Sequence, residues 1–232
     1  GIFSSWVLRT LEEKRRIYTF HACALAKGDE LLLILGGAGA GKTVFILAGL
    51  EMGWRIFSTE FVHFRLNGGI EFLKGPVKDP VRLETLEYYF PWIVESLGVN
   101  LKKTVGGKAL VDLSRYQTEA RSIKNPLITL VIPHVEEKRE MLTKLVVEEE
   151  EFLLRKLFHN ASDKIGTSTL LYGRLAVTGL DSSCLARMRK ENIQNLLRCE
   201  FINKAVVWIS GIKDVADFFR QMESSRTKEL NE

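Results

Sequence analysis

A short run of glycines followed by lysine and threonine has the residue types and the spacing needed to bind phosphate. Four residues separate Gly36 from Gly41, and Lys42 and Thr43 follow at once, giving the pattern G-x-x-x-x-G-K-[ST]. Because glycine has no Cβ, such a loop can curl round an anion with its N–H groups pointing inward, and a following helix adds the positive end of its dipole. Lys42 can then reach the β- and γ-phosphates of a nucleotide, while the Thr43 hydroxyl can bind Mg²⁺. The residues predicted to bind nucleotide are Gly36, Gly37, Ala38, Gly39, Ala40, Gly41, Lys42 and Thr43.

The elements on either side of this loop are the ones that a phosphate-binding loop requires. The apolar run 31–35 before it is typical of a strand, and an apolar helical pattern resumes at Val44. A glycine-rich turn could match by accident. With glycine at about 7% of residues, however, a chance match in a chain of this length is on the order of 1%. Nucleotide binding is therefore the favoured interpretation.

The composition describes an ordinary globular chain and excludes several other classes. Hydrophobic residues make up 46% and charged residues 27% of the 232 residues, and the net charge of +4 is only mildly basic. Basic residues alternate with acidic ones, so we expect no nucleic-acid partner. The three cysteines form no metal or disulfide pattern, and no membrane-spanning stretch or signal peptide is visible, so we expect a cytoplasmic location without membrane contact. The chain opens without Met, so we expect a processed or truncated N-terminus.

The segments next to the loop predict an α/β fold with a mixed, partly antiparallel sheet. The segment 16–26 is rich in β-branched, aromatic and small apolar residues, and the polar turn KGDE joins it directly to the strand 31–35. So short a connection makes an antiparallel hairpin, because parallel strands need a long crossover. The helix 43–52 is apolar nearly all round, so we expect it to be covered on both sides. It ends at Gly53, and the strand 54–58 returns parallel to the strand before the loop.

Beyond this unit the chain continues as further strands and helices of one domain. We predict strands at 61–66, 70–73, 109–113, 127–132 and 205–210, and helices within 81–97, 145–160, 162–175, 182–197 and 214–222. The tripeptide NGG marks a hairpin between the first two of these strands, and Pro133 is expected to close the strand 127–132. No repeat or linker divides the sequence. Residues 1–223 are therefore predicted to form a single domain, followed by a flexible C-terminal tail at 224–232.

The stretch FHACALAKGDELLLILGGAGAGKTVFILAGLEMGWRIFSTEFVHF carries the loop together with its hairpin, helix and returning strand. His21 opens the hairpin, and Gly53 closes the helix. In these features and in their spacing, the stretch resembles HPr kinase/phosphorylase and its kinase-like relatives, P-loop kinases related in fold to PEP carboxykinase. GGKALVDL, NPLITLVIPH and the Glu-rich helix start resemble the kinase-like branch more loosely. The resemblance implies a fold like the HPr kinase C-domain and PEP carboxykinase, with ATP and Mg²⁺ as cofactors.

Two departures from the family pattern narrow what the resemblance implies. The family's acidic pair falls on Thr59 and Glu60, so a hydroxyl, a weaker Mg²⁺ ligand, replaces the first carboxylate. Either Glu60 serves the metal through a water, together with Thr43, or catalysis is impaired. The Gly-Arg-Asn signature of the phosphorylase is absent from the sequence, so dephosphorylation of a protein serine is not implied.

Catalytic roles are predicted for Lys42, Glu60 and His21. Glu60 could accept a proton from the acceptor hydroxyl or position the metal, whereas the simpler alternative is a surface glutamate at a strand end. His21 could contact phosphate or acceptor, or it could be a core residue of its strand. Lower-ranked cationic candidates are Lys108 and Arg121, and His63 is predicted to be structural.

The leading hypothesis is an ATP-dependent kinase that transfers the γ-phosphate to a hydroxyl of a small molecule or to a protein serine. The alternative is a catalytically impaired nucleotide-binding sensor or assembly module of the same fold, which Thr59 keeps open. A generic P-loop ATPase or GTPase ranks third, because a hairpin precedes the loop and no N-K-x-D motif is present. The identity of the acceptor and association into a homo-oligomer both stay open.

Overall fold

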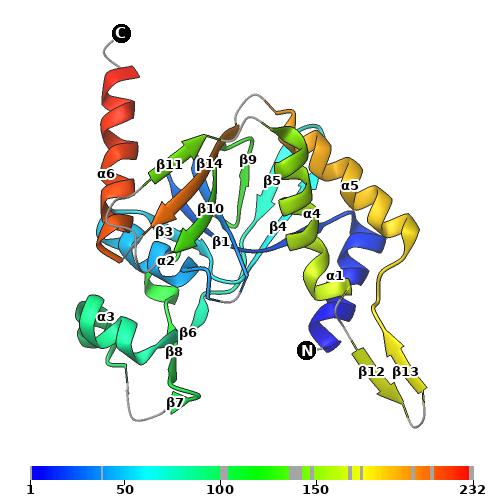
Figure 1. The fold of residues 1–232 in the computed structure, drawn as a ribbon, viewed down its shortest axis with the longest axis horizontal. Helices are drawn as coiled ribbons and strands as arrows, with labels where there is room; N and C mark the ends of the chain where they lie inside the picture. The colour runs from blue at the N-terminus through cyan, green and yellow to red at the C-terminus, as the bar shows by residue number, and fades with distance from the viewer. Residues whose placement is uncertain are drawn as a thin grey trace.

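The computed structural model describes residues 2–37, 39–99, 104–135, 143–146, 149–166, 169–172, 175–199, 202–209 and 212–229. A mixed β-sheet runs through the molecule, with α2 and α6 on one side and α1, α4 and α5 on the other (Figure 1). The α/β class with a mixed sheet is therefore confirmed. Of the described helices, none is long and apolar enough to cross a membrane. The helices are α1 Ile2–Arg15, α2 Lys42–Glu51, α3 Pro91–Leu97, α4 Glu150–Gly166, α5 Ser183–Leu197 and α6 Ile212–Glu229.

The main sheet has the strand order β11-β14-β10-β2-β1-β4-β5-β9, with β3 also paired to β1. Its parallel pairs are β10 with β2 and β10 with β14, and the other pairs are antiparallel. The strands are β1 Tyr18–Lys27, β2 Glu30–Leu35, β3 Arg55–Ser58, β4 Phe61–Leu66, β5 Ile70–Leu73, β9 Ser122–Lys124, β10 Leu127–Val135, β11 Thr143–Val146 and β14 Ile202–Ile209.

The predicted hairpin before the glycine-rich loop is confirmed. β1 and β2 pair antiparallel from Ala22↔Leu35 to Lys27↔Glu30, and Gly28 takes the positive φ of 64° that the tight turn requires. The strand that returns after α2 does not pair with β2, because β1 lies between them. β3 and β2 are each antiparallel to β1, so they run in the same direction, as the sequence predicted.

β3 and β4 form one broken line along β1. Ser58 pairs with Ala24 and Phe61 pairs with His21, so the register is the same on both sides of the break. The two residues in the break are Thr59 and Glu60. The acidic-pair positions of the sequence therefore lie beside the middle of β1, close to where β2 enters the glycine-rich loop.

Helix α2 is buried because the sheet covers one side of it and α6 covers another. Its residues 45–49 are buried, and Phe45 packs edge-on against Phe218 at 5.6 Å between ring centroids. Gly49 marks the closest approach, because a Cβ at this position would lie 2.3 Å from Cδ1 of Leu25 in β1. This two-sided cover confirms the expectation drawn from the helix's apolar composition.

A buried arginine ties together the helices on the other side of the sheet. Arg189 of α5 is 1% exposed and donates to both carboxylate oxygens of Glu12 in α1, at 2.8 and 2.7 Å. It also donates to Asp181, at 2.8 Å, and to the Ser162 hydroxyl of α4, at 2.8 Å. Burial alone would lower the pKa of Arg189, but the hydrogen bonds and charges of Asp181 and Glu12 raise it. The guanidinium is therefore a charged link between three helices.

A smaller sheet of three strands projects beside α2 and α3 (Figure 1). It pairs β8 antiparallel with both β6 and β7, and in this register Asp79 of β6 lies opposite Val111 of β8. This sheet matters for the site because β6 delivers Asp79 to the start of α2. The remaining elements here are β6 Lys78–Arg82, β7 Thr104–Val105, β8 Lys108–Asp112, the π-helical turn Thr85–Tyr89 and the 3-10 turn Ser114–Tyr116.

Four predictions about the second half of the chain were wrong in part. The expected helix 162–175 ends at Gly166, and an antiparallel hairpin follows it. Helix α4 begins at Glu150, since the residues expected as its start form β11. The strands of that hairpin are β12 Thr169–Tyr172 and β13 Leu175–Thr178.

Strand β10 and helix α6 both run past their predicted ends. β10 continues through Pro133 to Val135, because β14 pairs with it along this whole stretch, although β2 pairs with it only as far as Val131. α6 continues to Glu229, past the helix end predicted at residue 222. The flexible tail expected from residue 224 stays a prediction. Residues 230–232 of that predicted tail lie outside the described part of the chain.

Candidate phosphate-binding site

The glycine-rich loop joins the end of β2 to the start of α2, as its sequence pattern predicts. Gly39 and Gly41 have φ of 84° and 88°, values that other residues adopt only with strain. At Gly36 a Cβ would lie 2.6 Å from the Cβ of Ala40, so that position is also restricted to glycine. Ala38, one of the predicted nucleotide-binding residues, lies outside the described residues. The loop is therefore a tight turn whose shape depends on at least three of its glycines.

Lys42 folds back over this loop. Its Nζ donates to the carbonyl oxygens of Gly36 and Gly37, at 2.7 and 2.8 Å. A lysine ammonium has three donors, so these two bonds hold the charge over the loop and leave a third direction for an anion. The predicted phosphate-contacting lysine is thus placed on the loop that its motif requires.

Thr43 is hydrogen-bonded to an acidic residue, Asp79, that was not among the residues predicted from the sequence. Its hydroxyl donates to Oδ2 of Asp79 at 2.6 Å, a short charge-assisted hydrogen bond across 36 residues of sequence. Burial raises the pKa of Asp79, and the Glu60 charge raises it further, while the Thr43 bond and the charges of Lys42 and Lys108 oppose the increase. Asp79 therefore lies among the charges of the predicted site, including one of the lower-ranked cations.

Thr59 has a structural role that explains how Asp79 reaches its place. Thr59 is 3% exposed, and its hydroxyl lies 3.1 Å from the carbonyl oxygen of Pro76 and 3.2 Å from that of Lys78. Its backbone N–H also donates to the Pro76 carbonyl at 2.8 Å. These bonds fix the segment that leads into β6. The hydroxyl is therefore engaged with backbone, and the carboxylate next to Thr43 comes from Asp79 instead.

Glu60 and the lower-ranked candidate Arg121 are placed differently. Glu60 is exposed in the break between β3 and β4, and its charge acts on Asp79. Arg121 lies just before β9, where its carbonyl accepts the N–H of Lys74 at 3.0 Å. In the described part of the chain, no contact joins Arg121 to the glycine-rich loop. The structure thus brings Glu60, but not Arg121, toward the predicted site.

His21 lies in β1, where it contacts α4 and β4. Its Nδ1 is 3.1 Å from Oδ2 of Asp163 in α4, and its ring lies 6.0 Å from that of Phe61. Burial lowers the pKa of His21, the nearby charges of Lys164 and Lys42 lower it further, and Asp163 opposes them. His21 is close to the loop because the next residue, Ala22, pairs with Leu35 at the end of β2.

His63 is paired within the sheet. Its Nδ1 lies 2.8 Å from the Thr19 hydroxyl of the neighbouring strand, and burial lowers the pKa of the His63 ring. This arrangement agrees with the structural role predicted for it.

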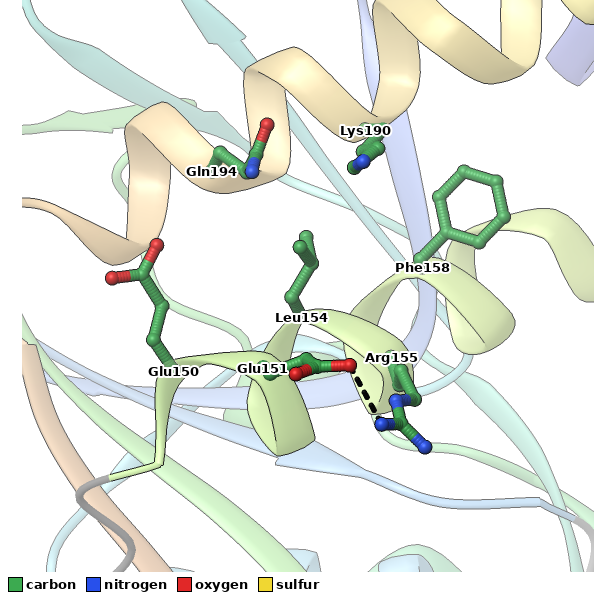
Figure 2. Close-up of a pocket in the computed structure, with 7 residues that line it drawn as sticks. All are labelled: Glu150, Glu151, Leu154, Arg155, Phe158, Lys190 and Gln194. Carbon is green, nitrogen blue, oxygen red and sulfur yellow. Dashed lines mark hydrogen bonds and ion pairs between the residues drawn. The ribbon is translucent and has the colours of Figure 1, made fainter.

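A groove of about 520 Å³ lies elsewhere, between α4 and α5. Figure 2 shows that the two helices contribute both apolar and charged side chains to it, including an ion pair of 2.6 Å between Glu151 and Arg155. No residue of the glycine-rich loop lines this groove. Its lining residues are Glu150, Glu151, Leu154, Arg155, Phe158, Lys190 and Gln194.

The donor set next to the loop fits a magnesium ion shared with phosphate. Thr43, Asp79 and Glu60 offer only oxygen donors, which Mg²⁺ prefers. Within the described residues no group of three or more His, Cys, Asp or Glu side chains could hold a metal. A nucleotide-bound Mg²⁺ typically takes one or two carboxylates and completes its shell with phosphate and water, so a smaller set suffices.

Comparison with known proteins adds little to this geometry. No family model matches the chain, and no curated protein matches it. Among solved structures, the HPr(Ser) kinase/phosphatase from Coxiella burnetii aligns with 91% of this chain and 98% of its own, at 12% sequence identity and a TM-score of 0.39. A likeness of this strength carries no functional argument, so the site must be interpreted from its own residues.

Proposed function

We propose that this chain is an ATP-dependent kinase that transfers the γ-phosphate of ATP to a hydroxyl of a small molecule or a protein serine. The observation that carries the proposal is the pairing of Thr43 with Asp79 beside the glycine-rich loop. A hydroxyl and a carboxylate held together at the first turn of the helix that follows such a loop are the groups that place Mg²⁺ on a nucleoside triphosphate.

Each residue of the site has a distinct task in this proposal. The loop N–H groups and the start of α2 bind the phosphates, and Lys42 exchanges one of its loop carbonyls for a phosphate oxygen. Thr43 and Asp79 would hold Mg²⁺, and Glu60, whose charge acts on Asp79, would contribute directly or through a water. The metal supplies charge neutralisation as negative charge moves toward the leaving phosphate. Lys42 and Lys108 add positive charge to the same region.

The alternative, a nucleotide-binding module without transfer chemistry, is favoured by one observation. The position where the resembled family has its first acidic residue is Thr59, whose hydroxyl is engaged with two backbone carbonyls. Asp79 weakens this alternative, because it returns a carboxylate to the site from the neighbouring strand. We therefore rank phosphoryl transfer above nucleotide binding alone. We also propose a cytoplasmic location, where ATP and Mg²⁺ are available.

The proposal can be tested by nucleotide binding to the purified chain. Mg–ATP should raise the melting temperature by mass action, and Lys42→Ala should remove most of that gain because Lys42 lies on the loop. Lys190→Ala is the matched control, since Lys190 lines the separate groove between α4 and α5. Calorimetry that detects no purine nucleotide binding at millimolar concentration would rule out the proposal. Binding without phosphoryl transfer to any acceptor, water included, would favour the binding module.

A further inference from the structure

His21 of β1 and Asp163 of α4 form a hydrogen-bonded pair near the glycine-rich loop. The two side chains are 13% and 34% exposed, and their atoms meet at 3.1 Å although they are 142 residues apart in sequence. The His21 backbone is held as well, because Asn160 donates from Nδ2 to the His21 carbonyl at 2.7 Å. One turn of α4 therefore fixes both the strand and the ring.

His21 lies close to the start of the glycine-rich loop. The next residue of β1, Ala22, pairs with Leu35, the last residue of β2 before the loop. The positive charge of Lys42 acts on both His21 and Cys23. His21 is thus placed between α4 and the lysine that is proposed to bind the γ-phosphate.

An unpartnered polar atom lies next to this pair. Oδ1 of Asn160 is buried and has no hydrogen-bond partner among the described residues, although its Nδ2 is bonded to His21. A buried acceptor without a donor is costly, and it is satisfied when a hydroxyl or a water binds beside it. The amide that carries this unsatisfied acceptor is bonded through its Nδ2 to the backbone of His21, three residues before Asp163 in the same helix.

We propose that His21 is the general base of the transfer reaction and that Asp163 positions it. The inference rests on the kinase function proposed above. When Nδ1–H donates to the Asp163 carboxylate, the proton is fixed on Nδ1 and Nε2 keeps its lone pair. A hydroxyl donor bound beside the ring can then give its proton to Nε2.

The reaction balances with these groups. The acceptor hydroxyl loses its proton to Nε2 of His21 as its oxygen forms a bond to the γ-phosphorus. The bond from that phosphorus to the oxygen bridging to the β-phosphate breaks, and its electron pair leaves with the nucleoside diphosphate. The resulting imidazolium is stabilised by Asp163 until it releases the proton to solvent. In this arrangement Glu60, whose charge acts on Asp79, would assist metal binding, and His21 would accept the proton.

Burial, more than the neighbouring charges, favours the neutral form of the ring by lowering the pKa of His21. The charged groups that face it are Asp163 and Lys164 from α4 and Lys42 from α2, and Phe61 from β4 covers it without a charge. Burial and the two lysines lower the pKa of His21, so at neutral pH the ring is in the form that accepts a proton.

The tautomer can be measured without any turnover. Two-bond ¹H–¹⁵N spectra of the labelled full chain should show His21 protonated at Nδ1 and unprotonated at Nε2. Asp163→Asn should reverse this pattern, because the introduced amide can donate to Nδ1. The His21 signals are assigned as those that disappear from the spectrum of His21→Gln. A ring protonated at Nε2 in the wild type, or a pattern unchanged in Asp163→Asn, would overturn the positioning by Asp163.

The base role is tested in single-turnover transfer from γ-labelled Mg–ATP to water. His21→Gln should slow transfer by about 10²-fold and abolish the loss of rate as the pH falls from 8 to 5.5. Asp163→Asn should also slow transfer, and His159→Gln, which alters an exposed histidine of the same helix, should not. A wild-type rate in His21→Gln would overturn the inference and leave the kinase function intact. Absence of nucleotide binding in the wild type would instead refute the proposed function.

Discussion

Asp79→Asn separates what the site needs for binding from what the fold needs for stability. The substitution keeps the shape of a side chain that is buried beside Thr43 but removes its charge. Because burial raises the pKa of Asp79, the ionised carboxylate is less stable in the folded chain than in water. The ligand-free protein should therefore become more stable, whereas its complex with Mg–ATP should become weaker.

The expected size follows from two opposing contributions. A hydrogen bond to a charged group stabilises by about 1.5–3 kcal/mol and a neutral one by about 0.5–1.5 kcal/mol, so weakening the Thr43 bond costs about 1 kcal/mol. Burial of the Asp79 charge destabilises the folded chain by several kcal/mol, and the attraction of Lys42 and Lys108 offsets part of this. Asp79→Asn removes the remaining penalty. A net gain on the order of 1 kcal/mol would raise the melting temperature by about 2–4 °C in a chain of this length.

Metal binding should change in the opposite direction. Loss of even an outer ligand usually lowers metal affinity by about 10- to 100-fold, so a lost carboxylate should cost at least 10-fold. The assay is thermal unfolding with and without Mg–ATP, together with titration of Mn²⁺ in place of Mg²⁺ followed by electron paramagnetic resonance. Asp112→Asn, on the exposed face of the same small sheet, is the matched control. A lower melting temperature without ligand, combined with an unchanged affinity for Mn²⁺–ATP, would refute this account of Asp79.

Three further predictions concern the fold. Arg189→Ala leaves the buried Glu12 carboxylate without its arginine and should lower the free energy of unfolding in urea by about 3–5 kcal/mol. Arg187→Ala, at an exposed position of the same helix, should change it little. Equal effects of the two variants would contradict the stabilising role of Arg189. Gly75→Ala places a Cβ 2.2 Å from the Phe61 carbonyl oxygen and should lower the free energy of unfolding in urea by about 1–3 kcal/mol. Gly166→Ala is the control and should change it less, because the space around Gly166 is open. Stability should fall between pH 7 and pH 5, because burial lowers the pKa of His21 and of His63, so the unfolded chain binds more protons there. In His63→Gln the free energy of unfolding in urea should depend less steeply on pH over this range. An unchanged dependence would argue against His63 as a source of the effect.

The sequence predicted the parts of the site that are encoded locally. The loop, the KGDE hairpin and the apolar helix all depend on residues within a few positions of one another, and each has a strong signal of composition or spacing. The hairpin 169–178 was missed because its apolar residues also fit a helical period, and only the tertiary environment selects the strand.

Asp79 and Asp163 could not be predicted in the same way. Asp79 precedes a proline in a segment for which the sequence predicted neither strand nor helix, and its contact with Thr43 depends on β6 joining a separate sheet. The partner of His21 lies on a helix far along the chain. The one available signal was the departure at Thr59, since a missing carboxylate invites a search for another acidic residue nearby.

The pairing of β1 has a consequence for how the site can move over time. Ala24, Leu25 and Ala26 are paired on both sides, with β2 on one edge and β3 on the other. Their amides should therefore exchange with solvent deuterium only through global unfolding, more slowly than those of strands paired on one side. The loop and Glu60 lie next to this strand and His21 belongs to it, so we expect a bound nucleotide to order the loop while the strand stays closed. Protection should then rise in residues 36–43 on binding, while the rates in the middle of β1 shift only with total stability.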